Sequence, residues 1–279
     1  MAAGMQYRWI VLAGMGLALG CAKAEAPKAA AAAGPNVIDV SATEFAFTMP
    51  DSIPAGPTTF RLTNTGGQIH HLQLVRLEDG KTLADMQSMD PNAPPPSWVV
   101  EVGGPNAAAP GGGVSEGTLD LAPGNYAALC FVPGPDGMPH VMKGMMHPLT
   151  VVPSTEVRAM PEADVTLTLA DYSFTPSVPL TAGKHVIKLV NAAQQTHELV
   201  LVKLGPGKTP QDLLQWVEKQ EGPPPGMPIG GATGIGKGGT QLMMVDLTPG
   251  QYGLFCFVPD ATDGKPHFMH GMVQEITVN

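Results

Sequence analysis

The stretch CFVPGPDGMPHVMKGM, residues 130–145, recurs late in the chain as CFVPDATDGKPHFMHGM, residues 256–272. Each copy places one Cys, one His and one Met at matching positions around a loop that contains Pro and Gly. Thiolate, imidazole and thioether form a soft donor set, which favours copper over Mg²⁺ or Ca²⁺. The two segments therefore predict two similar metal sites, with the donors Cys130, His140, Met145, Cys256, His267 and Met272.

The duplication covers far more than these two loops. EFAF at residues 44–47 matches DYSF at residues 171–174, and His70 matches His197. The offset between matching residues stays at 126 or 127 throughout the chain. A repeat of this length is a whole domain and not one unit of a solenoid. The chain is therefore expected to contain two copies of one domain.

Alternating apolar and polar residues mark strands in both copies. The predicted strands include residues 36–46, 58–63 and 72–77 in the first copy and residues 164–173, 184–190 and 199–204 in the second. Pro-Gly turns at residues 123–124 and 249–250 lead into further strands that end at the two Cys residues. Short strands joined by such turns predict two antiparallel sandwiches, each with about seven or eight strands.

Each copy is also expected to contain one short helix. Thr209 followed by Pro210 predicts a helix start, and residues 82–89 are a weaker counterpart. Two Pro- and Gly-rich segments, residues 91–113 and 222–239, are expected to be surface loops. The predicted fold class is all-β, with two tandem Greek-key β-sandwiches. Its parts are a signal segment at residues 1–21, a tether at 22–35, a first domain at 36–153, a linker at 154–163 and a second domain at 164–279.

A trigonal metal site needs one more imidazole in each copy. His70 and His197 are the candidates, since each follows an Asn by six residues and opens a predicted strand. In the first copy the competing neighbours are His71 and Met146. The repeat pairs His71 with Glu198, which cannot replace an imidazole, so His70 is preferred. Met145 is preferred over Met146, because Gly144-Met145 matches Gly271-Met272 in the second copy.

With these donors, both copies resemble cupredoxins, the family of azurin, plastocyanin and the blue-copper domain of copper nitrite reductase. The resemblance covers residues 36–152 and 164–279, and the long loops are most similar to those of the nitrite reductase domain. It implies a type 1 copper ion in each copy, held by a Cys thiolate, two in-plane His nitrogens and an axial Met. The implied ligands are His70, Cys130, His140 and Met145 for one ion and His197, Cys256, His267 and Met272 for the other.

The N-terminus predicts export. Arg8 precedes a short apolar stretch at residues 9–20, as in a secretory signal. The following LALGC resembles the lipobox of bacterial lipoproteins, which implies a lipid on Cys21 and an anchor on the periplasmic side of a membrane. A plain secretory signal is the alternative. An oxidising compartment favours disulfides, but Cys130 and Cys256 occupy equivalent places in the two copies, which favours a metal at each thiol instead.

Three functions compete for such a chain: electron transfer, copper enzyme chemistry, and copper storage or delivery. Copper oxidases and nitrite reductases of this family place a His beside the ligand Cys and add His-x-His pairs. Here the Cys neighbours are Leu129, Phe131, Phe255 and Phe257, and the sequence contains no His-x-His pair. The sequence therefore favours one-electron transfer without enzymatic activity.

The partners are expected to be periplasmic redox proteins such as c-type cytochromes. A net charge of −9 favours a basic partner and disfavours nucleic acid, which requires clustered Lys and Arg. In the family that the chain resembles, the edge of the loop His is the electron exit. Two roles are open for the apolar residues of the loops: they surround this exit, or they pack in the core. These residues are Phe131, Met138, Phe257 and Phe268. His147, His185 and His270 have no counterpart in the other copy and are expected to be surface residues.

Overall fold

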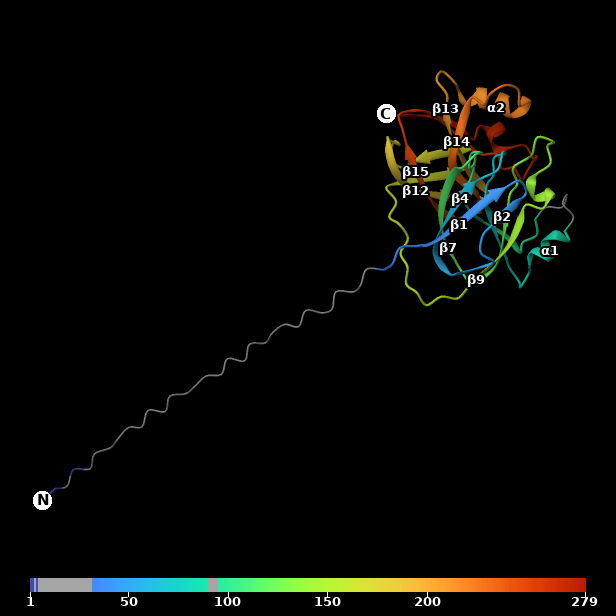
Figure 1. The fold of residues 1–279 in the computed structure, drawn as a ribbon. Coiled ribbons are helices and arrows are strands. Elements are labelled where there is room, and N and C mark those ends of the chain that lie inside the picture. The colour runs from blue at the N-terminus through green and yellow to red at the C-terminus, as the bar shows by residue number, and fades with distance from the viewer. Residues whose placement is uncertain (3, 5–31, 90–94) are drawn as a thin grey trace. The chain divides into compact units, whose positions relative to one another are not determined.

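The structure, a computed structural model, describes residues 1–2, 4, 32–89 and 95–279. Ala32–Asn279 form one compact unit, which consists mainly of β-strands (Figure 1). Most of the signal segment and tether, including Cys21, lies outside the described residues, so lipidation stays a prediction. Within the described parts of the chain, no helix is long and apolar enough to span a bilayer.

The first half of the compact unit contains strands β1 to β9 and one short α-helix. These elements are β1 (Asn36–Thr43), β2 (Ala46–Thr48), β3 (Ser52–Pro54), β4 (Gly56–Asn64), β5 (Gln73–Leu77), α1 (Leu83–Gln87), β6 (Val99–Gly103), β7 (Gly113–Leu121), β8 (Gly124–Leu129) and β9 (Met146–Val152). A 3₁₀ turn, η1 (His140–Lys143), lies between β8 and β9.

The second half repeats this order from β10 to β17, without a counterpart of β3. Its elements are β10 (Val165–Ala170), β11 (Ser173–Pro176), β12 (Gly183–Asn191), β13 (His197–Leu204), α2 (Pro210–Lys219), β14 (Gly226–Ile235), β15 (Thr240–Leu247), β16 (Gly250–Phe255) and β17 (Val273–Val278). The 3₁₀ turn η2 (His267–His270) lies between β16 and β17, at the place that η1 occupies in the first half.

Two sheets run through both halves. One has the order β11-β10-β12-β15-β7-β4-β1-β2, and the other has the order β17-β16-β13-β14-β6-β5-β8-β9-β3. The halves join where β15 pairs with β7 and where β14 pairs with β6, both antiparallel. The all-β sandwich prediction is confirmed, while the exact domain boundaries stay predictions because the sheets continue from one half into the other.

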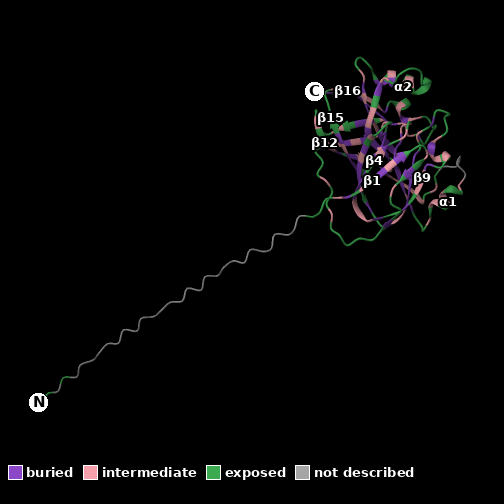
Figure 2. Cartoon of the chain, viewed as in Figure 1, coloured by how far each residue is buried: buried purple, intermediate pink, exposed green. Residues whose placement is uncertain are grey.

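Alternating burial explains why these segments are strands. In β10 (VTLTLA), Val165, Leu167 and Leu169 are buried and the Thr and Ala residues between them are partly exposed. Successive side chains of a strand point to opposite faces, so this pattern gives the sheet one apolar face. Figure 2 shows buried segments running through the interior of the compact unit. The buried side chains of each half form one main cluster, and each cluster includes a Cys and a Met of the predicted sites.

The expected helices are present, and both begin with the same cap. Thr209 accepts a hydrogen bond from the amide of Asp212, whose carboxylate accepts one from the Thr209 amide in return. Thr82 and Asp85 make the same reciprocal pair at the start of α1. Such a capping box satisfies amides that the first helical turn leaves free. Leu213 then packs α2 onto a small cluster beside β13 and β16.

The two predicted surface loops are corrected in part by the structure. Residues 91–113 contain β6, residues 222–239 contain β14, and these strands meet at the joint between the halves. Two Gly residues at this joint lie so close to a neighbouring carbonyl oxygen that the Cβ atom of any other residue would clash with it. Gly231 has φ +150°, and a Cβ atom on it would lie 1.9 Å from the carbonyl oxygen of Leu199. At the matching position of the first half, a Cβ atom on Gly104 would also lie 1.9 Å from a carbonyl oxygen, that of Leu72.

Gly231→Ala is therefore expected to destabilise the whole unit by about 4 kcal/mol, since a buried backbone clash adds to an unfavourable φ. The matched control is Gly207→Ala, which also has a positive φ of +70° but nothing within 4 Å of the added Cβ. The control is expected to cost about 1 kcal/mol. Urea denaturation measures both values. Equal losses for the two variants would contradict the close approach at Gly231.

Candidate metal centre

The first site consists of three buried side chains from three separate segments. His70 lies just before β5, Cys130 directly follows β8, and His140 begins η1. The Cys130 Sγ lies 3.9 Å from His70 Nδ1 and 3.5 Å from His140 Nδ1, and the two Nδ1 atoms are 3.2 Å apart. All three side chains have no solvent exposure. Three donor atoms thus converge on one point in the interior.

The size of this triangle fits a metal ion. A point equidistant from the three donor atoms lies about 2 Å from each of them, close to the ~2.0–2.3 Å of metal–imidazole and metal–thiolate bonds. The donor set therefore fits a soft metal with a preference for S and N ligands.

The second site repeats this geometry. Cys256 Sγ lies 3.9 Å from His197 Nδ1 and 3.4 Å from His267 Nδ1. The two imidazole ring centres are 4.6 Å apart, compared with 4.8 Å in the first site. His197, Cys256 and His267 are also fully buried. Two independent copies of the motif have therefore folded to the same arrangement.

Backbone hydrogen bonds fold each Cys-to-Met loop back on itself. In the first site the Cys130 amide donates to the Met145 carbonyl at 3.2 Å, and the His140 amide donates to the Val132 carbonyl at 3.0 Å. Gly144, with φ +96°, ends the 3₁₀ turn in a conformation that suits Gly. The second loop, which is one residue longer, makes the matching bonds from Cys256 to Met272 and from His267 to Val258.

An Asn anchors the segment that carries the other His. Asn64 Nδ2 donates to the carbonyls of Gln68 at 2.6 Å and Ala108 at 2.9 Å. Asn191 makes the equivalent bonds to Gln195 and Ile235, both at 2.7 Å. The Asn that precedes each His by six residues therefore shapes the turn that delivers the imidazole.

The structure distinguishes the two pairs of adjacent candidate ligands in the first copy, His70 from His71 and Met145 from Met146. His71 points away from the triangle, and its Nε2 accepts a hydrogen bond from the Phe131 amide at 2.8 Å. Met145 is fully buried in the same cluster as Cys130. Met146 is only partly buried, packs in a different cluster and receives a contact from Gln87. Geometry thus favours His70 and Met145, while the ligand assignment itself stays a prediction.

The outer nitrogens of the loop histidines meet a Gln in both sites, a feature that the sequence analysis missed. His140 Nε2 lies 3.1 Å from Gln68 Oε1, and His267 Nε2 lies 3.4 Å from Gln195 Oε1. A hydrogen bond on the outer nitrogen orients the imidazole and leaves Nδ1 free as a donor to the metal. The signal available in the sequence was that Gln68 and Gln195 match in the repeat.

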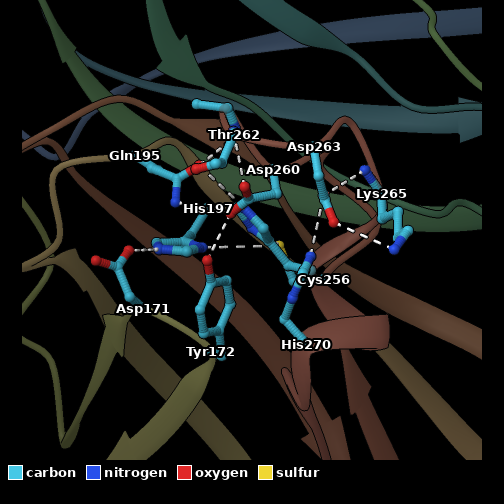
Figure 3. Close-up of polar contacts among 12 residues, drawn as sticks. Asp171, Tyr172, Gln195, His197, Cys256, Asp260, Thr262, Asp263, Lys265 and His270 are labelled. Atoms are coloured by element: carbon cyan, nitrogen blue, oxygen red, sulfur yellow. Dashed lines mark hydrogen bonds and ion pairs between the residues drawn. The ribbon is translucent and has the colours of Figure 1, made fainter.

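The second site contains more negative charge than the first. His197 Nε2 is 3.0 Å from Asp171 Oδ1, and His267 Nε2 is 3.8 Å from Asp260 Oδ2 (Figure 3). In the first site the nearest carboxylate, Glu44, is 3.9 Å from His70 Nε2, and this nitrogen has no hydrogen-bond partner among the described residues. The Lys143 ammonium also lies near His140 and lowers its pKa, after the larger effect of burial.

A third group of metal-binding residue types, Asp260, Asp263 and His270, lies beside the second site. Asp260 accepts hydrogen bonds from Tyr172 and Gln195, and Asp263 lies 3.1 Å from His270 Nε2 (Figure 3). These contacts brace the loop between β16 and η2. Two of the other histidines outside the sites also lie beside a carboxylate, His147 beside Asp51 and His185 beside Asp164.

Burial controls the protonation of the donors. It raises the pKa of the Cys130 thiol to about 11 and that of Cys256 to about 12. Burial, with a smaller effect of His140, lowers the pKa of His70 to about 4. The pKa values of the other site histidines are lowered as well, also mainly by burial. Near neutral pH the metal-free sites therefore hold neutral thiols and neutral imidazoles.

No protein-family model matches the chain, and no curated protein matches it. Among solved structures, auracyanin from Roseiflexus castenholzii is 26% identical, with 43% of this chain and 99% of that chain covered and a TM-score of 0.31. A copper-containing nitrite reductase from Thermus scotoductus is 13% identical, with 89% and 62% covered and a TM-score of 0.25. A blue copper oxidase from Nitrosomonas europaea is 14% identical, with 88% and 86% covered and a TM-score of 0.26. Because these TM-scores are low, the metal assignment rests on the geometry of the chain's own residues.

The raised pKa values predict slow thiol chemistry in the metal-free protein. At about pH 8 roughly one Cys130 thiol in a thousand is ionised, and the thiolate is the reactive form. A Cys21→Ala variant, in which only the two site thiols remain, should therefore react with a thiol reagent much more slowly when folded than in guanidinium chloride. Rapid labelling of both thiols in the folded, metal-free chain would contradict the buried geometry.

Proposed function

We propose that the chain is an exported copper protein with two type 1 sites, which carries electrons one at a time between redox partners. The ligands of the first copper would be His70, Cys130, His140 and Met145, and those of the second would be His197, Cys256, His267 and Met272. The observation that carries this proposal is the buried triangle of one Sγ and two Nδ1 atoms, which occurs twice with the size of a metal site.

The donor types support copper over other metals. Two His and one Cys in a plane, with a more distant Met, suit copper that alternates between Cu(I) and Cu(II). The protein holds these donors before any metal arrives, because the loop hydrogen bonds and the Asn and Gln contacts fix each side chain. A fixed donor set resists rearrangement when the copper changes its charge, which favours fast electron transfer.

Burial of the donors supports a carrier more than an enzyme. None of the in-plane donors has solvent exposure, so the sites offer no visible path for a substrate to reach the metal. The residues beside each Cys are Phe or Leu, and none of them can hold a second metal next to the first. Copper storage or delivery is the alternative, and a preformed, buried donor set disfavours the easy release that delivery requires.

An apolar surface beside the first ligand loop supports docking of a partner. Phe131, Met138 and Met142 are exposed there, next to the buried His140. At the second loop, Phe257 and Phe268 are only partly buried and pack edge to face against each other, whereas Met269 is exposed. We therefore propose that redox partners such as c-type cytochromes approach the ligand loops, and that the export signal and lipid on Cys21 place the protein on the periplasmic side of a membrane.

The visible spectrum tests the copper assignment. Copper-loaded protein should show an intense band from charge transfer between the Cys thiolate and Cu(II). Cys130→Ser and Cys256→Ser should each remove part of this band, and the double variant should remove it completely. Met146→Leu, next to a proposed ligand but outside the site, is the matched control and should leave the band unchanged. A colourless Cu(II) protein, or a band that survives in the double variant, would contradict the proposal.

Proton release tests the protonation of the donors independently of colour. Because the thiols have raised pKa values and the imidazoles are already neutral, each site should lose about one proton when a metal binds at about pH 7. Zn²⁺ is the probe, since it takes the same ligands and has no redox chemistry. Calorimetry in buffers of different ionisation enthalpy measures the number. Binding without proton release would show that the thiols do not change protonation at the sites.

A further inference from the structure

A chain of buried polar contacts joins the two sites across the joint between the halves. It begins at the residue that follows each site His. The Glu198 amide donates to Cys256 Sγ at 3.4 Å, and the His71 amide lies near Cys130 Sγ and lowers the pKa of that thiol, against the larger, raising effect of burial. The side chains of His71 and Glu198 then turn away from their own sites towards the joint. Both are almost completely buried.

Asn106 lies between these two side chains and closes the connection. Its Nδ2 donates to Glu198 Oε2 at 3.0 Å, and its side chain lies close enough to the His71 imidazole to raise the pKa of that ring, against the larger, lowering effect of burial. Asn106 is 2% exposed, so water does not compete for these contacts. A single residue of the first half therefore links the segments that carry both thiols. The path from Cys130 Sγ to Cys256 Sγ needs only the three residues His71, Asn106 and Glu198.

The same two side chains also hold the backbone beyond each Cys. His71 Nε2 accepts the Phe131 amide at 2.8 Å, and Glu198 Oε1 accepts the Phe257 amide at 2.9 Å. Each end of the connection thus contacts its Cys residue twice, once at the sulfur and once through the following peptide. An electron delocalised onto a Cys sulfur has a bonded route into the connection from either site.

We propose that His71, Asn106 and Glu198 form an internal bridge over which one electron passes from the second metal site to the first. This inference rests on the proposed copper function. With copper bound, the transfer would oxidise Cu(I) to Cu(II) at the second site and reduce Cu(II) to Cu(I) at the first, without transfer of a proton or a covalent bond. The chain then works as a two-step relay and not as two independent carriers.

The charges around the sites set the direction. Asp171 and Asp260 lie beside the imidazoles of the second site, and negative charge stabilises the more positive Cu(II) state there. At the first site the carboxylate of Glu44 is more distant, at 3.9 Å from His70 Nε2, and the nearby Asp136 carboxylate is paired with the Lys143 ammonium at 2.7 Å. The first site should therefore hold the electron more tightly. Electrons would enter at the second loop and leave at the first, where the apolar surface is exposed.

Half-reduction tests the direction. Single-site variants Cys130→Ser and Cys256→Ser provide a reference paramagnetic resonance spectrum for each remaining Cu(II). After one electron has been added per chain of the copper-loaded natural protein, the residual Cu(II) signal should match that of Cys130→Ser, in which only the second site is intact. A residual signal that matches Cys256→Ser would overturn the direction.

The rate of internal electron exchange tests the bridge. A rapid photochemical one-electron reductant is applied, and the approach of the two sites to equilibrium is followed by their visible spectra. Asn106→Leu, which removes the connecting amide, should slow this exchange severalfold and leave the two reduction potentials unchanged. Glu198→Gln puts an NH₂ group near the donating Nδ2 of Asn106 and should also slow the exchange. This second variant replaces Asn106→Leu as the test if Asn106→Leu does not fold.

Thr233→Val is the matched control for the bridge. Thr233 occupies the position that matches Asn106 in the repeat and is fully buried at the same joint. Its hydroxyl bonds to the carbonyls of Leu72 and Gly104, and the hydrogen bonds found among the described residues do not link it to His71 or Glu198. It should leave the exchange rate unchanged. Equal slowing by the control, or no slowing by the bridge variants, would overturn the bridge while the colour remains. Absence of the copper–thiolate band in the natural protein would instead overturn the proposed function itself.

Discussion

The hydrogen bond from a Cys amide to a Met carbonyl is the contact on which each site depends. It joins Cys130 to Met145 and Cys256 to Met272, and it closes the loop between two neighbouring strands of one sheet. Closure brings the loop His back above the Cys, so that its Nδ1 faces the sulfur. The other His arrives from the strand on the opposite side of the Cys strand, positioned by an Asn. Local loop geometry and sheet order together thus bring the donors to one point in the core.

The joint between the halves adds a second constraint. Both sheets continue across it, and backbone hydrogen bonds cross it from the Asn106 amide to the Gly231 carbonyl at 3.3 Å and from the Thr233 amide to the Gly104 carbonyl at 2.9 Å. A Cβ atom on Gly231 would lie 3.3 Å from Asn106 Cβ, and the Asn106 side chain reaches Glu198 in the other half. The sites are therefore embedded in one continuous structure, and the distance between them cannot vary as it would in two domains on a flexible linker. A fixed separation is a requirement for controlled electron exchange.

The strands and the donor residues could be predicted from the sequence because both leave local signals. Alternation marks the strands, capping residues mark α2, and duplication selects His70 and Met145 from their neighbours. The joint could not be predicted in this way. Its strands β6 and β14 lie in Gly- and Pro-rich segments that usually form loops, and their pairing joins residues more than a hundred positions apart. The roles of Gln68 and Asn106 were missed for the same reason, since each acts on a residue that only the fold brings near.

Copper stoichiometry combined with paramagnetic resonance tests whether the chain holds two type 1 copper ions. Two Cu(II) ions per copper-loaded chain are expected, both with the narrow hyperfine splitting that a strong copper–thiolate bond produces. A chain that binds no copper, or that binds Cu(II) with the wide splitting of an ordinary nitrogen and oxygen site, would contradict this expectation. A single narrow signal from one ion per chain would contradict the two-site arrangement, because the two buried triangles are nearly identical in geometry.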